Sequence, residues 1–261
     1  MGKIISIVNQ KGGVGKTTTA VNLTATLHDL GLRVLLCDFD PQANATSGMG
    51  ISKRKLKRSV YDVVINGEDT QSAIVSTPYG DVLPSTGELA GAAVELINME
   101  DRSYRLAKAL EKVKDQYDVI FIDCPPSLEM LTVNALCAAN SILVPVQCEY
   151  FALEGLSDLM STLRSVKKKM NPTLEIFGVV LTMYDGRTNF SAQVAQEVRK
   201  YFPGKVFATA VPRNVRLAEA PSHGVPVTVY DRISRGSVAY KALAQEFKER
   251  LCFPLKKVRK E

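Results

Sequence analysis

The chain has 261 residues, of which 46% are hydrophobic, so it can bury one large α/β core or at most two. No apolar run approaches the length of a membrane span, and the first apolar run leads straight into a glycine-rich loop, so neither a membrane-spanning nor a secreted protein is expected. A formal net charge of +6 is compatible with a polyanionic partner but does not require one.

The five cysteines are an odd number and form no C-x-x-C pair. This favours reduced, mostly buried side chains in a cytoplasmic protein. They are Cys37, Cys124, Cys137, Cys148 and Cys252.

An apolar strand, a glycine-rich turn and a helix open the chain. Residues 1–8 predict a buried strand, and residues 19–30 predict a helix that Gly31 closes. Between them, residues 10–18 read Gln-Lys-Gly-Gly-Val-Gly-Lys-Thr-Thr. The glycines would free backbone N–H groups to converge on a phosphate, at which the positive end of the helix also points. The order of these elements therefore predicts a phosphate-binding loop.

Two side chains of this loop carry the expected chemistry. Lys16 is placed to contact the β- and γ-phosphates, and the Thr17 hydroxyl is placed to ligate Mg²⁺. The generic loop has a glycine where this chain has Gln10, and it needs no lysine where this chain has Lys11.

A second apolar strand, 33–37, ends in two aspartates, Asp38 and Asp40, which Pro41 follows. Ligand-binding groups of parallel sheets lie just beyond the carboxyl ends of the strands, so these carboxylates favour metal or water chemistry beside the loop. The alternative is an ordinary strand-end turn with solvated aspartates.

The densest basic run, 53–58, fits either a solvated surface turn or a contact with a phosphate backbone. Beyond it, Ser59 is expected to cap a short helix. The helices predicted in this part of the chain are 60–65, 88–98 and an amphipathic one at 103–114, and a further strand ends at 83–85.

An apolar strand at 118–123 ends in Asp123, which Pro125 and Pro126 follow. A strand of this form after a phosphate loop is typical of a segment whose carboxylate supports the Mg²⁺ hydration shell opposite Thr17. The two prolines stiffen the turn, which fits a switch that responds to the γ-phosphate.

Strands and helices continue to alternate to the end of the chain. We predict strands at 141–146, 176–182 and 206–211 and helices at 128–139, 153–169, 190–201 and 237–251. The lysines at 167–169 suit the negative end of their helix dipole, and 256–260 form a basic tail. This pattern predicts an α/β fold with a single doubly wound, mostly parallel sheet flanked by helices on both faces, as in P-loop NTPases.

Three segments resemble the motifs of a known ATPase family. Residues 11–18 look like a deviant Walker A motif, residues 38–44 like its A′ companion, and residues 121–126 like its B motif. The chain is thus similar to the ParA/MinD superfamily of deviant Walker A ATPases.

Two further segments narrow the resemblance to the chromosomal ParA (Soj) partition ATPases. They are Gln-Cys-Glu-Tyr-Phe-Ala-Leu-Glu-Gly-Leu at 147–156 and Pro-Arg-Asn-Val-Arg-Leu-Ala-Glu-Ala-Pro-Ser-His-Gly at 212–224. The resemblance runs from Gly2 to about Leu251, so we expect one ATPase domain over 1–251 and a basic C-terminal tail over 252–261.

The resemblance implies that ATP and Mg²⁺ bind between two chains packed face to face. Lys11 would reach the partner's phosphates, and Gly12 would lie where the partner approaches closely. Asp40 is expected to position the attacking water, and Asp38 and Asp123 to support the outer shell of the metal.

The resemblance also implies the nucleotide contacts. Met183, Pro212 and Asn214 would surround the adenine, with Arg213 beside them; core packing and a simple turn are the alternative for Met183 and Pro212. The expected nucleotide-binding residues are Lys11, Gly12, Gly13, Val14, Gly15, Lys16, Thr17, Thr18, Met183, Pro212, Arg213 and Asn214.

By the same resemblance, Arg187 and Arg216 are expected on a surface of the homodimer that binds double-stranded DNA, although ordinary solvated or salt-bridged arginines would look the same. No helix-turn-helix or zinc-finger pattern is visible, so binding should be independent of sequence and sensitive to salt. The family further implies a nucleoid-associated protein whose slow hydrolysis a ParB-like protein stimulates. The specific-binding region that precedes the loop in larger plasmid relatives is not expected, and His28 and His223 are expected to be structural.

Two other classes compete with this interpretation. A membrane-surface ATPase resembling MinD would end in an amphipathic helix, whereas Phe253 here is followed by Pro254 and a basic segment. A metabolic or redox enzyme on the same scaffold would need a small-molecule pocket or cluster-binding cysteines, for which the sequence shows no signature. We therefore expect no stable membrane association.

Overall fold

The computed structural model of the protein describes residues 2–149 and 152–252. Of the basic tail expected over 252–261, only Cys252 falls within this part, and the lysines and arginine at 256–260 lie outside the described residues.

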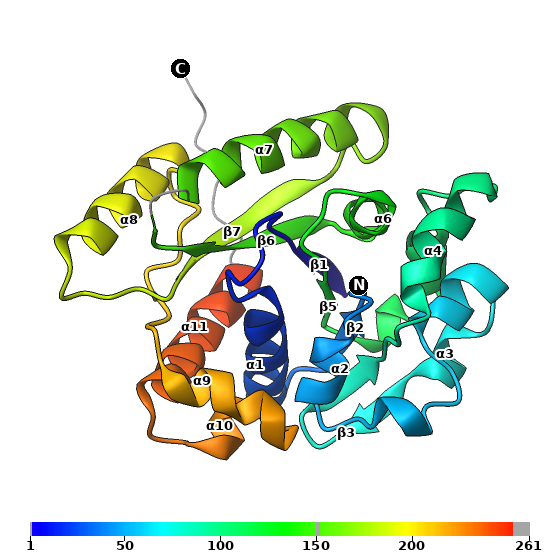
Figure 1. The fold of residues 1–261 in the computed structure, drawn as a ribbon, viewed down its shortest axis with the longest axis horizontal. Coiled ribbons are helices and arrows are strands. Elements are labelled where there is room, and N and C mark those ends of the chain that lie inside the picture. Colours follow the sequence, from blue (N-terminus) through cyan, green and yellow to red (C-terminus); the bar gives the residue numbers. More distant parts are fainter. Residues whose placement is uncertain (1, 150–151, 253–261) are drawn as a thin grey trace.

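One seven-stranded sheet forms the centre of the molecule, with helices above and below it (Figure 1). Its strand order is β3-β4-β2-β5-β1-β6-β7, and every neighbouring pair is parallel except β3 and β4. The strands are β1 (Lys3–Ile7), β2 (Val34–Asp38), β3 (Val75–Thr77), β4 (Gly80–Leu83), β5 (Val119–Asp123), β6 (Ser141–Gln147) and β7 (Glu175–Thr182). The predicted doubly wound, mostly parallel α/β sheet is confirmed.

Two layers of helices cover the two faces. One face carries α1 (Lys16–Asp29), α2 (Asn44–Gly48), α9 (Val215–Glu219), α10 (Val227–Tyr230) and α11 (Arg235–Cys252). The other carries α3 (Thr70–Ala73), α4 (Leu89–Glu95), α5 (Arg105–Glu111), α6 (Met130–Ala138), α7 (Ala152–Lys169) and α8 (Asn189–Tyr201). Among the described residues, no helix combines the length and apolar character needed to cross a membrane.

The central strands are buried on both faces, which explains why they read as continuous apolar runs. In β5, Ile120 and Ile122 belong to one hydrophobic core, whereas Val119 and Phe121 belong to the other. All four side chains are fully buried. The strands β2 and β5 end at aspartates, Asp38 and Asp123, which lie side by side at the carboxyl-terminal edge of the sheet.

Most predicted elements are confirmed within a few residues. The first helix, however, begins at Lys16 rather than Thr19, and the short helix that Ser59 caps continues as a π-helix, Asp62–Asn66. Turns of 3-10 helix occupy Lys53–Lys55, Leu96–Asn98, Lys114–Gln116 and Ala220–His223. The strand predicted to end at 83–85 is β4, whereas β3 and the short helices α2, α3, α9 and α10 were not predicted.

The strand predicted at 206–211 is wrong. The segment runs beside β7 but makes only isolated bridges, between Val206 and Val179 and between Pro212 and Tyr184. In between, the N–H groups of Ala208 and Thr209 donate to the carboxylate of Glu246 on α11, at 2.9 and 3.0 Å. Because a helix side chain takes these donors, the ladder is interrupted.

Candidate nucleotide site

The site lies where the carboxyl ends of β1, β2 and β5 meet. Asp38 and Asp123 are register partners at the ends of β2 and β5, and β1 lies beside β5 on its other edge. The glycine-rich loop leaves β1 and enters α1 at this edge. The topology thus brings the loop and the predicted aspartates together.

The backbone of the loop adopts the conformation that its glycines allow. Gly13 and Gly15 have φ angles of 75° and 87°, in the left-handed region that favours glycine. A Cβ atom added at Gly12 or at Gly13 would meet none of the described residues within 4 Å, so their backbone is open on that side.

Two side chains outside the predicted set hold the loop in place. The Asn9 amide donates to the carbonyl of Pro145 at 2.8 Å and accepts from the N–H of Lys11 at 3.0 Å. The Thr182 hydroxyl, at the end of β7, donates to the carbonyl of Val14 at 2.8 Å. The sheet itself therefore fixes both sides of the loop.

Lys16 is almost fully buried at the start of α1. Its ammonium donates to the carbonyl of Lys11 at 3.0 Å. Burial lowers the pKa of Lys16, and the negative charges of Asp123 and Asp40 partly oppose this. The ammonium lies in a desolvated pocket in which a phosphate would be a strong partner.

Asp123 is fully buried, and neither of its carboxylate oxygens has a hydrogen-bond partner within the described residues. Burial, with the nearby charge of Asp38, raises the pKa of Asp123 well above its usual range. The Thr17 hydroxyl lies near enough to lower this pKa in part but outside hydrogen-bonding geometry. A buried carboxylate without a partner is costly unless a cation compensates it.

Asp38 is also fully buried, but α2 supplies partners for it. Its Oδ2 accepts from the N–H and the hydroxyl of Thr46, both at 2.7 Å, and Thr46 Oγ1 in turn accepts from the N–H of Ser85 at 2.9 Å. Burial raises the pKa of Asp38 to about 6 even so. Asp40 is close by and largely buried, and its Oδ1 accepts from the N–H of Gln42 at 2.9 Å.

These residues fit a Mg²⁺ ion bound to a nucleotide. In the part of the chain that the structure describes, no three His, Cys, Asp or Glu side chains converge as a complete ligand set. A cation here would therefore take oxygens from Thr17, from phosphate and from water, as Mg²⁺ commonly does. The unpartnered carboxylate of Asp123 and the carboxylate of Asp38 are available to that water shell.

The four residues expected around the adenine also come together. Tyr184 donates its N–H to the carbonyl of Val211 at 3.1 Å, which places the end of β7 beside the segment 211–214. The guanidinium of Arg213 approaches the sulfur of Met183 at 4.0 Å. Met183 has a φ of 50°, which is unusual for a residue with a side chain. Of the other two predicted residues, Pro212 bridges Tyr184 and Asn214 caps α9 by accepting from the N–H of Arg216.

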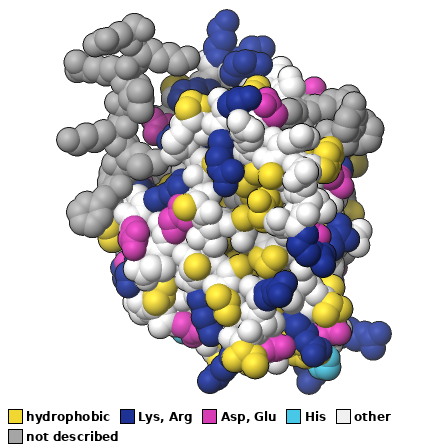
Figure 2. Space-filling model, turned by 90° about the vertical axis from the view of Figure 1, so that its left-hand side faces the viewer, with side chains coloured by type: hydrophobic (Ala, Val, Ile, Leu, Met, Phe, Trp, Pro, Cys, Tyr) yellow, Lys and Arg dark blue, Asp and Glu magenta, His cyan; other side chains and the backbone are white. Residues whose placement is uncertain are grey.

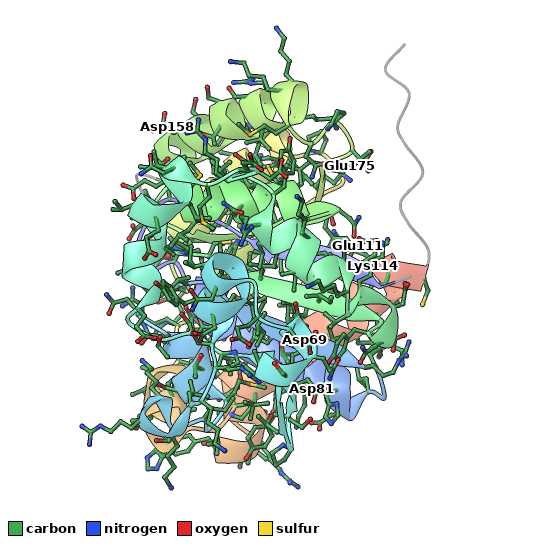
Figure 3. The ribbon with its side chains drawn as sticks, turned by 90° about the vertical axis from the view of Figure 1, so that its right-hand side faces the viewer. Asp69, Asp81, Glu111, Lys114, Asp158 and Glu175 are labelled. Atoms are coloured by element: carbon green, nitrogen blue, oxygen red, sulfur yellow. The ribbon has the colours of Figure 1, made fainter. Side chains whose placement is uncertain are left out.

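The remaining loop lysine, Lys11, points to a different partner. Its ammonium forms an ion pair with the carboxylate of Glu149, and the two side chains are 35% and 37% exposed. The adjacent Gln10 donates from its amide to Oδ2 of Asp158 at 3.0 Å. Asp158 lies on α7 (Figure 3). Neither Glu149 nor Asp158 is close to the loop in sequence.

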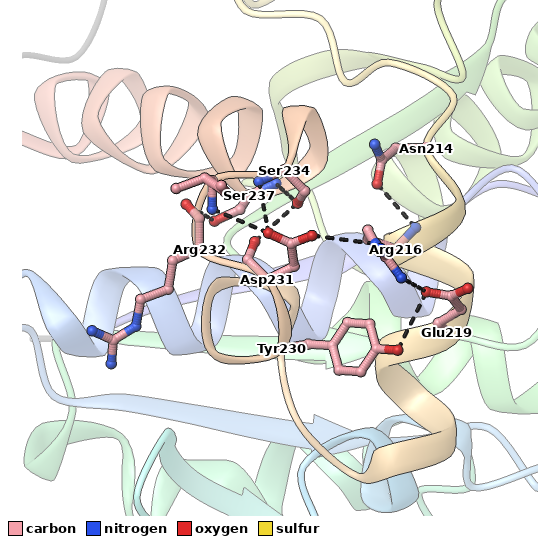
Figure 4. Close-up of polar contacts among 9 residues, drawn as sticks. Asn214, Arg216, Glu219, Tyr230, Asp231, Arg232, Ser234 and Ser237 are labelled. Atoms are coloured by element: carbon pink, nitrogen blue, oxygen red, sulfur yellow. Dashed lines mark hydrogen bonds and ion pairs between the residues drawn. The ribbon is translucent and has the colours of Figure 1, made fainter.

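The two candidate DNA-binding arginines lie outside this site and are ion-paired within the chain. Arg187 is 88% exposed and pairs with Asp185 at 2.8 Å, which lowers the pKa of Asp185 to about 2. Arg216 pairs with Glu219 at 2.8 Å and with Asp231 at 3.2 Å (Figure 4). Figure 2 shows the side of the molecule that carries α8 and α9, where Lys and Arg side chains are scattered among apolar ones.

A family model and two curated relatives match most of this chain. An AAA domain model matches residues 2–176. The chain is 57% identical over 248 residues to the sporulation initiation inhibitor protein Soj of Bacillus subtilis, covering 94% of this chain and 98% of Soj. It is 50% identical over 252 residues to the chromosome partitioning protein ParA of Myxococcus xanthus, covering 96% of this chain and 89% of that protein.

Solved structures agree with this chain on the fold. A structure titled cobyrinic acid a,c-diamide synthase from Mycobacterium smegmatis, with bound ADP and magnesium, superposes with a TM-score of 0.85 at 35% identity and covers 97% of this chain and 96% of that one. The cell division ATPase MinD of Pyrococcus furiosus superposes with a TM-score of 0.78 at 27% identity, covering 95% of this chain and 99% of that one. The chain therefore belongs to the ParA/MinD superfamily of deviant Walker A ATPases, in the group that contains the Soj and ParA chromosome-partitioning proteins.

Proposed function

We propose that the protein is an ATPase that dimerises with ATP, binds double-stranded DNA without sequence preference and acts in chromosome or plasmid partitioning. One observation carries the proposal: a phosphate loop with a second, partly exposed lysine beside three buried aspartates. The names of relatives at 50% identity and above support the partitioning role. We further propose a cytoplasmic, nucleoid-associated protein whose slow hydrolysis a ParB-like centromere-binding protein accelerates.

For hydrolysis, the chain contributes a positive charge that neutralises the phosphates, and carboxylates that orient water molecules. Bound Mg²⁺–ATP supplies an electrophilic γ-phosphate on which negative charge must be stabilised during transfer to water. Lys16 is buried at the loop and can neutralise that charge within its own chain. Asp40 is placed to orient the attacking water, while Asp38 and Asp123 orient the water shell of the cation. These roles require preorganised groups, and the hydrogen bonds of Thr46 to Asp38 support that requirement.

For dimerisation, the loop offers an open backbone at Gly12 and a second lysine, Lys11, whose ammonium is held by a partly exposed ion pair. Gly12 has free space beyond its Cα, which would allow a second chain to approach closely. Lys11 is partly exposed and sits at the entrance of the loop, so it can extend toward a neighbouring chain's phosphates. In this arrangement the charge of ATP becomes a contact between two chains, and pairing depends on ATP.

For DNA binding, the charge distribution along the sequence supports a polyanionic partner for the C-terminal part of the chain. Residues 161–261 contain 19 Lys and Arg against 8 Asp and Glu, whereas residues 59–129 contain 5 against 13. Arg187 and Arg216 belong to the basic part and are proposed to contact DNA phosphates. Each now pairs with a carboxylate, so phosphates would have to replace these partners, which makes binding weaker. The phosphate contacts themselves make binding sensitive to salt.

The decisive experiment measures retention of non-specific double-stranded DNA with and without ATP across a salt series. We expect ATP-dependent retention that falls steeply with salt, because phosphate contacts release counterions. The double variant Arg187→Ala and Arg216→Ala should lose retention while keeping ATP binding. Equal retention by the double variant would refute the proposed surface, and equal retention without ATP would refute the coupling to dimerisation.

The same preparation separates the competing classes. Flotation with anionic vesicles tests a membrane-surface role, against which α11 already buries Leu243, Ala244 and Phe247 in the core. A cluster shared between two chains would need accessible thiols, yet Cys37, Cys124 and Cys148 are buried, and burial raises the pKa of all three. The other two thiols lie on different helices, Cys137 on α6 and Cys252 at the end of α11. A chain that floats with vesicles and retains no DNA would overturn the proposal.

A further inference from the structure

The two residues that distinguish this loop from a generic one both have partners on the same distant segment. Lys11 pairs with Glu149, just after β6, and Gln10 donates to Asp158 on α7, which follows. Partner and loop residue are 138 and 148 positions apart in sequence. Two residues, Glu149 and Asp158, thus contact the loop at the two positions where it is unusual.

The environments of the two loop lysines differ in a way that matters here. Lys16 is almost fully buried, and its ammonium is bound to a carbonyl of the loop itself. Lys11 and Glu149 are each about one-third exposed, so their ion pair is partly solvated and can open without burying an unpaired charge. One lysine is fixed, and the other is held by a contact that is easily exchanged.

We propose that Glu149 is a positioning residue that holds Lys11 within its own chain and so opposes pairing of two chains. The inference rests on the proposed function, in which Lys11 serves the phosphates of the neighbouring chain. One ammonium cannot keep its full contact with Glu149 and also reach across an interface. Each chain must therefore release Lys11 before the dimer closes, and Glu149 sets the cost of that release.

The size of the effect follows from exposure and symmetry. A partly exposed ion pair changes an equilibrium by at most about five-fold. A symmetric dimer opens two such pairs, so the factors multiply. Replacing Glu149 by glutamine, which keeps the shape but removes the charge, should lower the dimer dissociation constant by about 2- to 25-fold. The gain should shrink at high salt, which screens the ion pair.

The test measures the dissociation constant of the full-length dimer by analytical ultracentrifugation, with Mg²⁺ and a non-hydrolysable ATP analogue so that hydrolysis does not interfere. Glu197→Gln is the matched control, because it breaks an exposed Glu–Lys pair with Lys200 on α8, away from the loop. We expect tighter pairing for Glu149→Gln and no change for the control. Tighter pairing is an effect that mere structural damage would not produce.

Several outcomes would overturn the inference. An unchanged dissociation constant means that Glu149 does not restrain Lys11, and a weaker dimer means that Glu149 acts across the interface instead. A wild-type chain that stays monomeric with the analogue refutes the proposed function itself and is recognised before any variant is compared. Independently of pairing, a double-mutant cycle of Lys11→Met and Glu149→Gln in thermal unfolding of the free chain should show an interaction energy between the two side chains. The absence of such an interaction energy would mean that Glu149 does not hold Lys11.

Discussion

Replacing Asp38 by asparagine should change how the stability of the nucleotide-free chain depends on pH. Asp38 is fully buried beside Asp123, and Thr46 donates to it twice. The amide oxygen of asparagine can accept both of these hydrogen bonds, but its NH2 group cannot accept the longer one, which the N–H of Asp40 donates to Asp38 Oδ1 at 3.3 Å. Losing that hydrogen bond shifts the free energy of unfolding by an amount that does not depend on pH, so the pH-dependent effect of the substitution is the removal of a buried negative charge. The variant therefore isolates the electrostatic cost of the site.

The direction and size of the change follow from the raised pKa. Because the folded chain binds the proton of Asp38 more tightly than the unfolded chain, this group contributes stability that is fully present below pH 4 and is lost as the pH rises through about 6. A rise in the pKa from 3.8 to about 6 corresponds to up to about 3 kcal/mol. The asparagine side chain has no proton to lose, so Asp38→Asn should become more stable relative to wild type by that amount between pH 4 and 7.

The assay is urea denaturation of wild type and variant at a series of pH values, without Mg²⁺ or nucleotide. Taking the difference in the free energy of unfolding between the two proteins cancels the titration of groups far from the site. A difference that stays constant from pH 4 to 7 would refute the reasoning, because it would mean that the carboxylate of Asp38 is not strained by burial. A difference of the opposite slope would mean that Asp38 is stabilised as an anion.

Three further substitutions test other parts of the site. Gly12→Val should leave the free energy of unfolding within about 0.5 kcal/mol of wild type, because a Cβ atom there would meet none of the described residues within 4 Å. The variant should nevertheless form no ATP-dependent dimers in ultracentrifugation, and dimers of normal affinity would contradict the role of Gly12. Asp40→Ala should lose most of the ATPase rate while binding ATP, and undiminished turnover in a phosphate-release assay would refute its role. Thr182→Val should destabilise the chain by about 1–2 kcal/mol, because it leaves the buried carbonyl of Val14 without the hydroxyl donor. Thr182→Ser keeps the hydroxyl and should melt close to the wild-type temperature. Equal melting temperatures for the Val and Ser variants would show that the hydroxyl is not needed.

The parts of this molecule that could be predicted from sequence are those whose signal is local. The apolar run of β5 and the glycines of the loop mark their own structure, because burial on both faces and positive φ angles restrict the residue types allowed. The proximity of Asp38 and Asp123, which end β2 and β5, could be predicted too, since parallel strands have their carboxyl ends at a common edge of the sheet.

The parts that were missed depend on contacts between distant residues. Nothing near Val206 indicates that Glu246 on α11 takes two backbone donors of the segment and so prevents a strand. Thr182 and Glu149 likewise contact the loop from 168 and 138 residues away. Thr46 is only eight residues from Asp38, and the Ser and Thr residues around it could have suggested such a donor, although not which of them it is.

The raised pKa values of the aspartates and the exposure of Lys11 lead to one account of why nucleotide would control this chain. Burial destabilises the charged forms of Asp38 and Asp123 in the free chain. A cation bound beside them offsets this electrostatic cost, so cation binding is favoured. Lys16 already lies in place, so the first nucleotide contact needs no rearrangement. The loop cation that must change partner is Lys11, whose contact with Glu149 is partly solvated. Nucleotide binding is thus preorganised, and pairing of the chains is the step with an adjustable cost. Substitutions at Asp38 should therefore alter the nucleotide affinity of the single chain, whereas those at Glu149 should alter dimerisation and leave the nucleotide affinity of the single chain unchanged.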